Sequence, residues 1–370
     1  MTTPVKRVAI NTGGGDAPGL NAVIHGAVYA ARGLGWQIFG IRDGYDGFLE
    51  PQNYPDGGLI ELRRSTVREI SHLGGTILGT TNRGNPFCRP TKQADGTIKV
   101  VDRSDELIEC FRKNHLDALV AVGGDGSLSI AHNLQQKGLR VVGVPKTIDN
   151  DLESTLLTFG FNTAVSFATE CIDRLHSTAL AHQRLIVVEV MGRNAGWIAL
   201  QAGLAGRADA ILIPEIPYEI EKVAAHLTRK YRGGKPYSIV VVAEGAKPHG
   251  GEVAIRSREV GRADRLGGIG EVVTAQLQEL TGKESRCVVL GHLLRGGSPT
   301  AIDRILGLTF GAAAIHALSM GMDGVMVALN PPRIDFVPIC KAIAELKLVP
   351  RDSEFVLVSR ALDISFGDIP

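Results

Sequence analysis

The sequence predicts an α/β protein built from two doubly wound, Rossmann-like lobes, each with a mostly parallel sheet. Short apolar runs rich in β-branched residues recur along its 370 residues. Segments with helical spacing separate these runs, and glycine and charged residues follow almost every run. Runs this uniformly apolar are typical of strands covered on both faces, as in parallel sheets. Because the runs are too many for one doubly wound unit, we expect two lobes.

The expected strands lie in residues 5–11, 36–42, 117–124, 139–145, 185–192, 209–215, 238–245, 286–293 and 323–329. One intervening segment, residues 162–181, has the helical period instead. Its apolar positions step by three or four residues and draw one stripe along a helix; they are Ala164, Ala168, Cys171, Leu175 and Ala179. Strand and helix therefore alternate, as a doubly wound sheet requires.

Composition excludes several classes of protein. Forty basic and 39 acidic residues give a net charge of +1, so no overall field attracts nucleic acid or an anionic membrane. The five cysteines are scattered without a CxxC pair, which argues against a disulfide framework or a zinc site. The first ten residues lack the long apolar segment typical of a signal peptide, and no later run approaches the roughly 18 apolar residues of a membrane span. We expect a cytoplasmic protein that binds neither nucleic acid nor membrane. Any anion-binding site must come from a local group of positive charges, because the net charge is close to zero.

In open α/β sheets, ligands bind at the carboxyl ends of the strands. The segments that follow expected strands are residues 12–21, 123–129, 145–151, 191–196, 243–247 and 291–297. Each is crowded with glycine and charged residues. We therefore expect the binding and catalytic residues to lie in these segments.

Two of these segments are glycine-rich. "GGGDAPG", residues 13–19, leads into an expected helix, with Pro18 in the first turn of that helix. The backbone N–H groups of these glycines could approach a phosphate. A tight turn explains the segment equally well, since the segment matches no standard nucleotide-binding motif. "GGDGS", residues 123–127, is more specific. Its glycines leave room for a polyphosphate and Asp125 could hold Mg²⁺, although an ordinary Asp-Gly turn is the alternative.

"PKTIDND", residues 145–151, contains the best candidate for proton transfer. Asp149 and Asp151 lie two residues apart, so in an extended segment they point to the same side. One could take a proton from a substrate hydroxyl while the other helps to hold a metal. A turn in which Asp and Asn bond their own backbone is the alternative interpretation.

Basic residues at strand ends or starts indicate binding of a phosphorylated substrate, because a guanidinium group can donate two parallel hydrogen bonds to a phosphate. They are Arg184, Arg193, Arg286 and Arg295, with His292 close to the last. Any single arginine could equally be a solvated surface group. Glu244 follows a strand and could accept hydrogen bonds from sugar hydroxyls, or be an ordinary loop carboxylate.

Taken in order, these motifs resemble the 6-phosphofructokinase family from Val8 to about Gly324. The resemblance implies transfer of a phosphoryl group to the C1 hydroxyl of fructose 6-phosphate, with Mg²⁺, in a homotetramer or homodimer with shared active sites. It implies a larger lobe that binds the phosphoryl donor, residues 1–160 plus 294–344. The smaller lobe, residues 161–293 plus 345–370, would bind the sugar phosphate, with the active site in the cleft between the lobes.

The resemblance also implies roles for individual residues. Asp149 would be the base, Thr147 would lie beside the acceptor, and Arg193 would complete the catalytic set. Metal ligands would be Asp125 and Asp151. The donor would be bound by Gly14, Arg83, Gly124, Asp125, Gly126, Ser127 and Lys146. The sugar phosphate would be bound by Thr147, Asp149, Arg184, Met191, Gly192, Arg193, Glu244, Arg286, His292 and Arg295. Arg184 and Arg286 would reach into the site of the neighbouring subunit.

Two residues give opposite indications about the donor. In this family, nucleotide users tend to have glycine where this chain has Gly126, and pyrophosphate users tend to have aspartate there. Lys146, in contrast, resembles the pyrophosphate enzymes. A lysine attracts either donor, by about 4 kcal/mol per unit charge at 4 Å, whereas a carboxylate at position 126 would repel the α-phosphate of a nucleotide. We therefore expect ATP as the donor.

Pyrophosphate-dependent transfer is the nearest alternative function. A lipid or NAD kinase is more remote, because those families do not account for residues 145–151 or for the arginines. A noncatalytic subunit would be expected to lack Asp149 or Asp125. His25 and Tyr29 replace the arginines with which many bacterial family members bind ADP or phosphoenolpyruvate, so we expect a weak or different response to these effectors.

Overall fold

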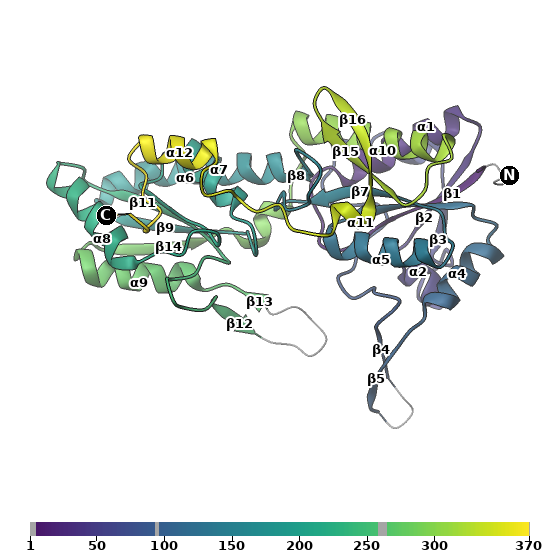
Figure 1. Ribbon diagram of the computed structural model, residues 1–370, viewed down its shortest axis with the longest axis horizontal. Coiled ribbons are helices and arrows are strands. Elements are labelled where there is room, and N and C mark those ends of the chain that lie inside the picture. The colour runs from purple at the N-terminus through teal and green to yellow at the C-terminus, as the bar shows by residue number, and fades with distance from the viewer. Residues whose placement is uncertain (1–4, 93–95, 258–264, 370) are drawn as a thin grey trace. The chain divides into compact units, whose positions relative to one another are not determined.

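The computed structural model describes residues 5–92, 96–257 and 265–369. The chain divides into two compact units (Figure 1). Unit 1 comprises Met1–Ile148, Leu152–Asn162 and Arg295–Glu345. Unit 2 comprises Asp149–Asp151, Thr163–Leu294 and Leu346–Pro370.

Unit 1 is built around an eight-stranded sheet in the order β16-β15-β7-β6-β1-β2-β3, with β8 paired to β7. The strands are β1 (Arg7–Thr12), β2 (Gln37–Ile41), β3 (Leu59–Leu62), β6 (Ala118–Gly123), β7 (Val141–Thr147), β8 (Phe159–Gly160), β15 (Val325–Asn330) and β16 (Arg333–Pro338). Only the two edge strands are antiparallel to their neighbours, β3 to β2 and β16 to β15. The rest of the sheet is parallel.

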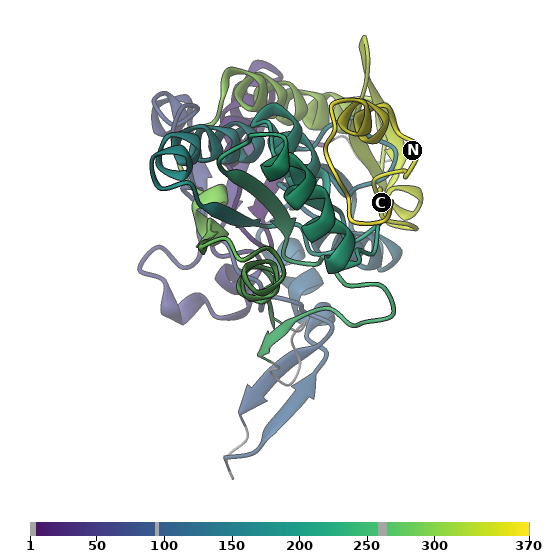
Figure 2. The ribbon, with the colours of Figure 1, turned by 90° about the vertical axis from the view of Figure 1, so that its left-hand side faces the viewer.

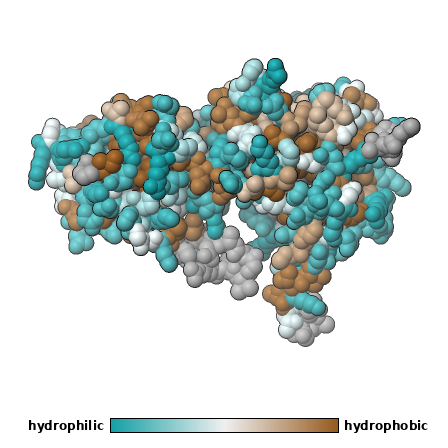
Figure 3. All heavy atoms as spheres, in the orientation of Figure 1, coloured by the Kyte–Doolittle hydropathy of each residue, from teal (hydrophilic) through white to brown (hydrophobic). Residues whose placement is uncertain are grey.

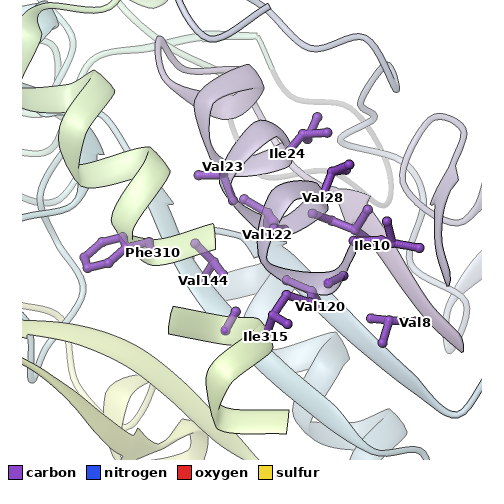
Figure 4. Packing of buried hydrophobic residues seen from close by; sticks show 14 of the residues in the cluster. Val8, Ile10, Val23, Ile24, Val28, Val120, Val122, Val144, Phe310 and Ile315 are labelled. Atoms are coloured by element: carbon purple, nitrogen blue, oxygen red, sulfur yellow. The ribbon is translucent and has the colours of Figure 1, made fainter. Parts of the chain in front are cut away.

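Alternate residues of the central strands face opposite layers of helices. Val8, Val120 and Val144 pack in the core beneath α1 (Leu20–Gly33) and α10 (Ala301–Ser319), as Figure 4 illustrates. The intervening residues, among them Ala9, Leu119 and Val141, pack in a second core. That core involves α2 (Asp46–Leu49), α4 (Ser104–Lys113), α5 (Asp125–Gln136) and α11 (Ile339–Ala342). Burial on both faces explains why these strands are continuous apolar runs.

Helices α1 and α10 approach each other closely because glycines stand at their contact. A Cβ atom at Gly26 would lie 2.2 Å from the Leu308 carbonyl oxygen, and one at Gly311 would lie 2.1 Å from the Val23 carbonyl oxygen. Among the described helices, α10 alone is long and apolar enough to suit a membrane span, and half of it is buried inside the protein. Its packing on α1 accounts for this apolar character.

Unit 2 has a four-stranded parallel sheet in the order β10-β11-β9-β14. Its strands are β9 (Leu185–Val190), β10 (Ala210–Leu212), β11 (Ser238–Ala243) and β14 (Ser285–Val289). Helices α8 (Ile220–Arg232) and α9 (Ile269–Thr281) cover one face. Helices α6 (Phe161–His182), α7 (Trp197–Ala205) and α12 (Glu354–Ala361) lie over the other (Figures 1 and 2).

The predicted fold class is confirmed, and each of the nine predicted runs overlaps a strand of one of the two large sheets. The helix predicted for residues 162–181 is α6. The predicted runs do not include β3, β8 and β16, or two hairpins, β4 (Arg89–Lys92) with β5 (Ile98–Val101) and β12 (Ile255–Ser257) with β13 (Arg265–Leu266). The short helix α3 (Arg64–Val67) and two 3₁₀ turns, Pro51–Asn53 and Gly291–Arg295, were also not predicted. These elements are short or lie at edges, where no continuous apolar run is needed.

The hairpin β4–β5 carries apolar side chains that its own unit does not cover. Ile98 is 74% exposed and Val100 is 56% exposed. Both lie on β5, where alternation places them on the same face, and Figure 3 shows this apolar surface on the hairpin.

Candidate active site

Two glycine-rich turns of unit 1 lie side by side because β1 and β6 are neighbours, with Thr12 opposite Val122. The Gly13 N–H donates to the Val122 carbonyl oxygen at 2.9 Å. A Cβ atom at Gly13 would lie 2.9 Å from Ser127 Oγ, and one at Gly123 would lie 2.2 Å from Ser127 Cβ. Glycine is therefore required for this close approach of backbone to side chain.

Lys146 brings a buried cation to the same place from the end of β7, the strand next to β6. It is only 3% exposed, and its Nζ donates to the Gly15 carbonyl oxygen. A Cβ atom at Gly14, which has φ +77°, would lie 3.3 Å from both Lys146 Nζ and Ser127 Oγ. The carboxyl ends of the three adjacent strands β1, β6 and β7 thus form one site, which we call the glycine cradle. It consists of the backbone of Gly13–Gly15 and Gly123, the Ser127 side chain and the Lys146 ammonium group.

Arg295, expected to bind the sugar phosphate, lies in unit 1 against the first glycine-rich turn. Its Nη1 donates to the Asp16 carbonyl oxygen at 3.1 Å. A Cβ atom at Gly15 would lie 2.8 Å from Arg295 Nη1. The cradle therefore has a second cation at its rim.

Helix α5 begins at the cradle with its N-terminus uncapped by any side chain, Gly124 being the residue before its first turn. Asp125 and Gly126 are exposed, and a Cβ atom built on Gly126 meets nothing within 4 Å. The N–H groups of a first helical turn and the positive end of the helix dipole together favour an anion. Open space at Gly126 leaves this anion site accessible.

The segment around Arg83 borders the cradle. The Gly14 N–H donates to the Thr81 carbonyl oxygen at 3.2 Å, and Thr80 Oγ1 donates to the Gly14 carbonyl oxygen at 2.6 Å. Arg83 itself is exposed. A small hollow beside it is lined by residues that include Gly13, Gly14, Tyr45, Thr81, Gly84 and Ser127. Neither threonine follows a predicted strand, so sequence patterns did not indicate them; Tyr45 follows the strand predicted at residues 36–42, but in a segment that was not among the candidate ligand segments.

The turn that contains the proposed base starts where β7 ends. Thr147 is the last residue of β7, and its carbonyl oxygen accepts a hydrogen bond from Thr158 Oγ1 at 2.7 Å. Asp149–Asp151 belong to unit 2, where Asn150 has φ +51°, a left-handed conformation that asparagine tolerates. Asp149 and Asp151 are half-buried.

Four of the predicted substrate residues of unit 2 meet at the carboxyl end of its sheet. Met191, Gly192 and Arg193 follow β9, and Glu244 follows its neighbour β11. The Glu244 N–H donates to the Val190 carbonyl oxygen at 2.9 Å, and the Gly245 N–H donates to the Gly192 carbonyl oxygen at 3.1 Å. His292, which is exposed, follows β14 at the same end of the sheet.

Arg184 and Arg286 lie elsewhere, at the amino ends of β9 and β14. Both guanidinium groups donate to Oε1 of Glu284, Arg184 at 2.8 Å. The hydrogen bond from Arg184 is the main reason that the pKa of Glu284 lies below its ordinary value. Within unit 2 the structure therefore separates these two arginines from the Met191–Arg193 turn.

The residues present suit a divalent cation bound together with a phosphate. Within residues 5–92, 96–257 and 265–369, no three His, Cys, Asp or Glu side chains gather as a metal cluster. Mg²⁺ commonly takes only one or two carboxylates and completes its shell with water and substrate phosphates. Asp125, exposed beside the cradle, offers that kind of ligand.

The positions expected to differ in effector binding lie on α1. The rings of His25 and Tyr29 stack with centroids 4.5 Å apart, and the Arg64 guanidinium lies 5.2 Å from the Tyr29 ring centroid. His25 Nδ1 is 2.8 Å from the Val67 carbonyl oxygen. The altered effector response stays a prediction.

The parallel α/β units and the glycine cradle at a helix N-terminus define a protein of the class that binds a polyphosphate at the ends of its strands. Comparison with known proteins narrows this class. The model of the Phosphofructokinase family matches residues 7–318, and the chain belongs to this family.

Two relatives and one solved structure illustrate the similarity. An "ATP-dependent 6-phosphofructokinase" of Chloroflexus aurantiacus is 48% identical over 371 residues, which cover 100% of this chain and 99% of the relative. A "Pyrophosphate--fructose 6-phosphate 1-phosphotransferase" of Amycolatopsis methanolica is 48% identical over 350 residues, 93% of this chain and 96% of that one. The structure of phosphofructokinase from Saccharomyces cerevisiae matches with a TM-score of 0.78 and 27% identity. That match covers 92% of this chain but only 45% of the yeast chain.

Proposed function

We propose that this chain is an ATP-dependent 6-phosphofructokinase, which transfers the γ-phosphoryl group of ATP to the C1 hydroxyl of fructose 6-phosphate in glycolysis. The observation that carries the choice of ATP is Gly126, which leaves the N-terminus of α5 open beside the glycine cradle. Full-length relatives with ATP-dependent names, at 43% to 48% identity, support the same donor. Pyrophosphate is the alternative donor, because a relative named for it is also 48% identical, over 93% of this chain.

On the donor side, the cradle of unit 1 binds the phosphate chain. Backbone N–H groups of α5 and the Gly13–Gly15 turn surround the phosphates, and Lys146 supplies a fixed positive charge. We propose that Asp125 holds Mg²⁺ together with the donor's phosphate oxygens. Asp151 is the second proposed metal ligand, on the side of the acceptor. The metal, when bound, would offset charge on the transferring phosphoryl group.

On the acceptor side, Asp149 accepts the proton of the C1 hydroxyl while Thr147 lies beside that hydroxyl. Met191, Gly192, Arg193, Glu244, His292 and Arg295 bind the sugar phosphate. The meeting of the Met191–Arg193 turn with Glu244 at one sheet end supports this assignment. We propose that the larger lobe, residues 1–160 plus 294–344, binds the donor and that the smaller lobe, residues 161–293 plus 345–370, binds the sugar phosphate.

We propose that Arg184 and Arg286 complete the site of a neighbouring subunit in a homodimer or homotetramer. Their position at the amino end of the unit 2 sheet, opposite the Met191–Arg193 turn, supports a role outside their own subunit's site. We also propose a cytoplasmic location, which the five free cysteine thiols support.

The Asp149→Asn variant tests this function. Asparagine keeps the shape of the side chain but cannot accept the proton, so we expect kcat to fall by at least ~10²-fold while binding of fructose 6-phosphate is largely kept. The measurement is the initial rate of fructose 1,6-bisphosphate formation with ATP and Mg²⁺, with the new phosphate located at C1 by phosphorus NMR.

Asp173→Asn is the matched control, because Asp173 is an exposed carboxylate on α6 in the same unit. We expect this control to retain wild-type kcat. Near-normal turnover of Asp149→Asn would remove Asp149 from its role, and a wild-type protein that forms no product would refute the function.

A further inference from the structure

The segment that follows α11 reaches the turn of the proposed base. Lys347 belongs to unit 2 and contacts this turn through two hydrogen bonds. Its backbone N–H donates to the Asp151 carbonyl oxygen at 2.9 Å, and its Nζ donates to Asn150 Oδ1 at 3.1 Å. A residue 197 positions away in sequence therefore holds both residues that follow Asp149.

The turn needs such support because β7 ends at Thr147, so no strand ladder extends to residues 149–151. Asn150 is only 3% exposed and has φ +51°. A non-glycine residue in this conformation persists where surrounding contacts fix it. A side chain that transfers a proton must be held to within about 0.5 Å of its productive position.

The same segment is also hydrogen-bonded to the start of α7, the helix that follows the Met191–Arg193 turn. The Lys347 carbonyl oxygen accepts a hydrogen bond from Trp197 Nε1 at 2.8 Å, and Trp197 is the first residue of α7. Two residues on, the Val349 N–H donates to Glu215 Oε1 at 2.9 Å. The Gly196 N–H donates to the same oxygen at 3.0 Å.

Glu215 joins the two segments, because its carboxylate accepts hydrogen bonds from both Val349 and Gly196. Burial raises its pKa above the ordinary value, while its hydrogen bonds from Val349 and Gly196 act in the opposite direction. The backbone from Lys347 to Val349 is thus fixed against the start of α7. Lys347 links the turn of Asp149 to the start of α7, the helix that follows the Met191–Arg193 turn in sequence.

We propose that Lys347 is a positioning residue for Asp149, acting through Asn150 and Asp151. The proposal rests on the proposed function, because it assigns Asp149 as the base. The Lys347 side chain fixes the amide of Asn150, its N–H fixes the Asp151 carbonyl group, and its carbonyl group connects both to α7. Lys347 itself does not touch the reacting atoms.

The test is the pair Lys347→Met and Lys347→Arg. Methionine removes the donor to Asn150 Oδ1 but keeps an unbranched side chain, one heavy atom shorter, and leaves the backbone bonds in place. We expect Lys347→Met to lower kcat by ~10-fold to ~10²-fold, the cost of a misplaced catalytic group, with KM for fructose 6-phosphate and ATP within about twofold. Arginine can donate to the same amide oxygen, so we expect Lys347→Arg to recover most of kcat.

Lys283→Met is the matched control. Lys283 Nζ donates to the Pro236 carbonyl oxygen at 3.2 Å, so this variant also removes a lysine hydrogen bond from unit 2, but not at the Asp149 turn. We expect it to leave kcat unchanged even if the melting temperature falls as much as in Lys347→Met. A purely structural role for Lys347 would make the two variants behave alike.

The rate of amide hydrogen exchange in the peptide that contains residues 148–152 measures the stability of the Asp149 turn independently of the reaction. We expect faster exchange there in Lys347→Met and wild-type exchange in Lys283→Met. Unchanged exchange, or an unchanged kcat in Lys347→Met, would overturn the positioning role. A wild-type protein that forms no fructose 1,6-bisphosphate would refute the proposed function instead, while the exchange data still decide whether Lys347 holds the turn.

Discussion

At the scale of single residues, Gly126 and Lys146 bear on the donor in different ways. Lys146 is buried under the cradle and bonded to the Gly15 carbonyl group, so its charge acts on whichever phosphate lies above it. Gly126 stands at the open N-terminus of α5, and a side chain there would project into space that no protein atom fills within 4 Å of its Cβ. A side chain at position 126 would therefore exclude a larger donor such as ATP, whereas the lysine at position 146 attracts any phosphate.

The Gly126→Asp variant tests this reasoning. A carboxylate about 4 Å from a phosphate charge costs about 4 kcal/mol under an effective dielectric near 20. After screening by solvent and Mg²⁺, we expect kcat/KM for ATP to fall by at least ~10-fold. Steady-state kinetics at saturating fructose 6-phosphate measure the effect.

Gln136→Glu is the control for added charge, because Gln136 is exposed at the far end of the same helix. We expect it to keep wild-type ATP kinetics. If Gly126→Asp also kept them, position 126 would not control access of the donor.

At the scale of elements, the tight contact of α1 with α10 depends on Gly311, whose Cβ would lie 2.1 Å from the Val23 carbonyl oxygen. We expect Gly311→Ala to lower the free energy of unfolding by ~1–3 kcal/mol, because the two helices must separate to admit the methyl group. Urea denaturation followed by circular dichroism measures this change.

Gly33→Ala is the matched control on α1, because a Cβ atom there meets nothing within 4 Å. Alanine has the higher helix propensity, so we expect this variant to be at least as stable as the wild type. Equal stability of the two variants would show that α1 and α10 can separate without cost.

Elements buried on both faces were predictable, and elements at edges were not. Strands such as β6 and β9 are apolar at nearly every position because helices cover both sides. The missed strand β4 reads "RPTK", which contains no apolar run. Antiparallel edge strands such as β16 are only partly covered, so their sequences lack the same signal.

The rule that ligands bind at strand ends predicted where most of the candidate site would lie, and the turns after β1, β6 and β7 do meet in one cradle. It could not reveal Thr80, which fixes the Gly14 carbonyl group, or Lys347, which fixes the Asp149 turn. Both contacts join segments far apart in the sequence. No local pattern marks such a partner.

At the scale of the whole molecule, overall similarity shows the family but does not decide the donor. Relatives named for ATP and for pyrophosphate are each 48% identical to this chain over nearly its full length. The choice between donors therefore depends on a few side chains around the cradle, and Gly126 is the one with a direct steric reason.

The most direct test of the account is a side-by-side comparison of donors with one preparation of the wild-type protein. Fructose 6-phosphate and Mg²⁺ are held constant, ATP or pyrophosphate is varied, and kcat/KM is measured for each from the formation of fructose 1,6-bisphosphate. We expect turnover with ATP and a rate near background with pyrophosphate. Turnover with pyrophosphate and none with ATP would contradict the account.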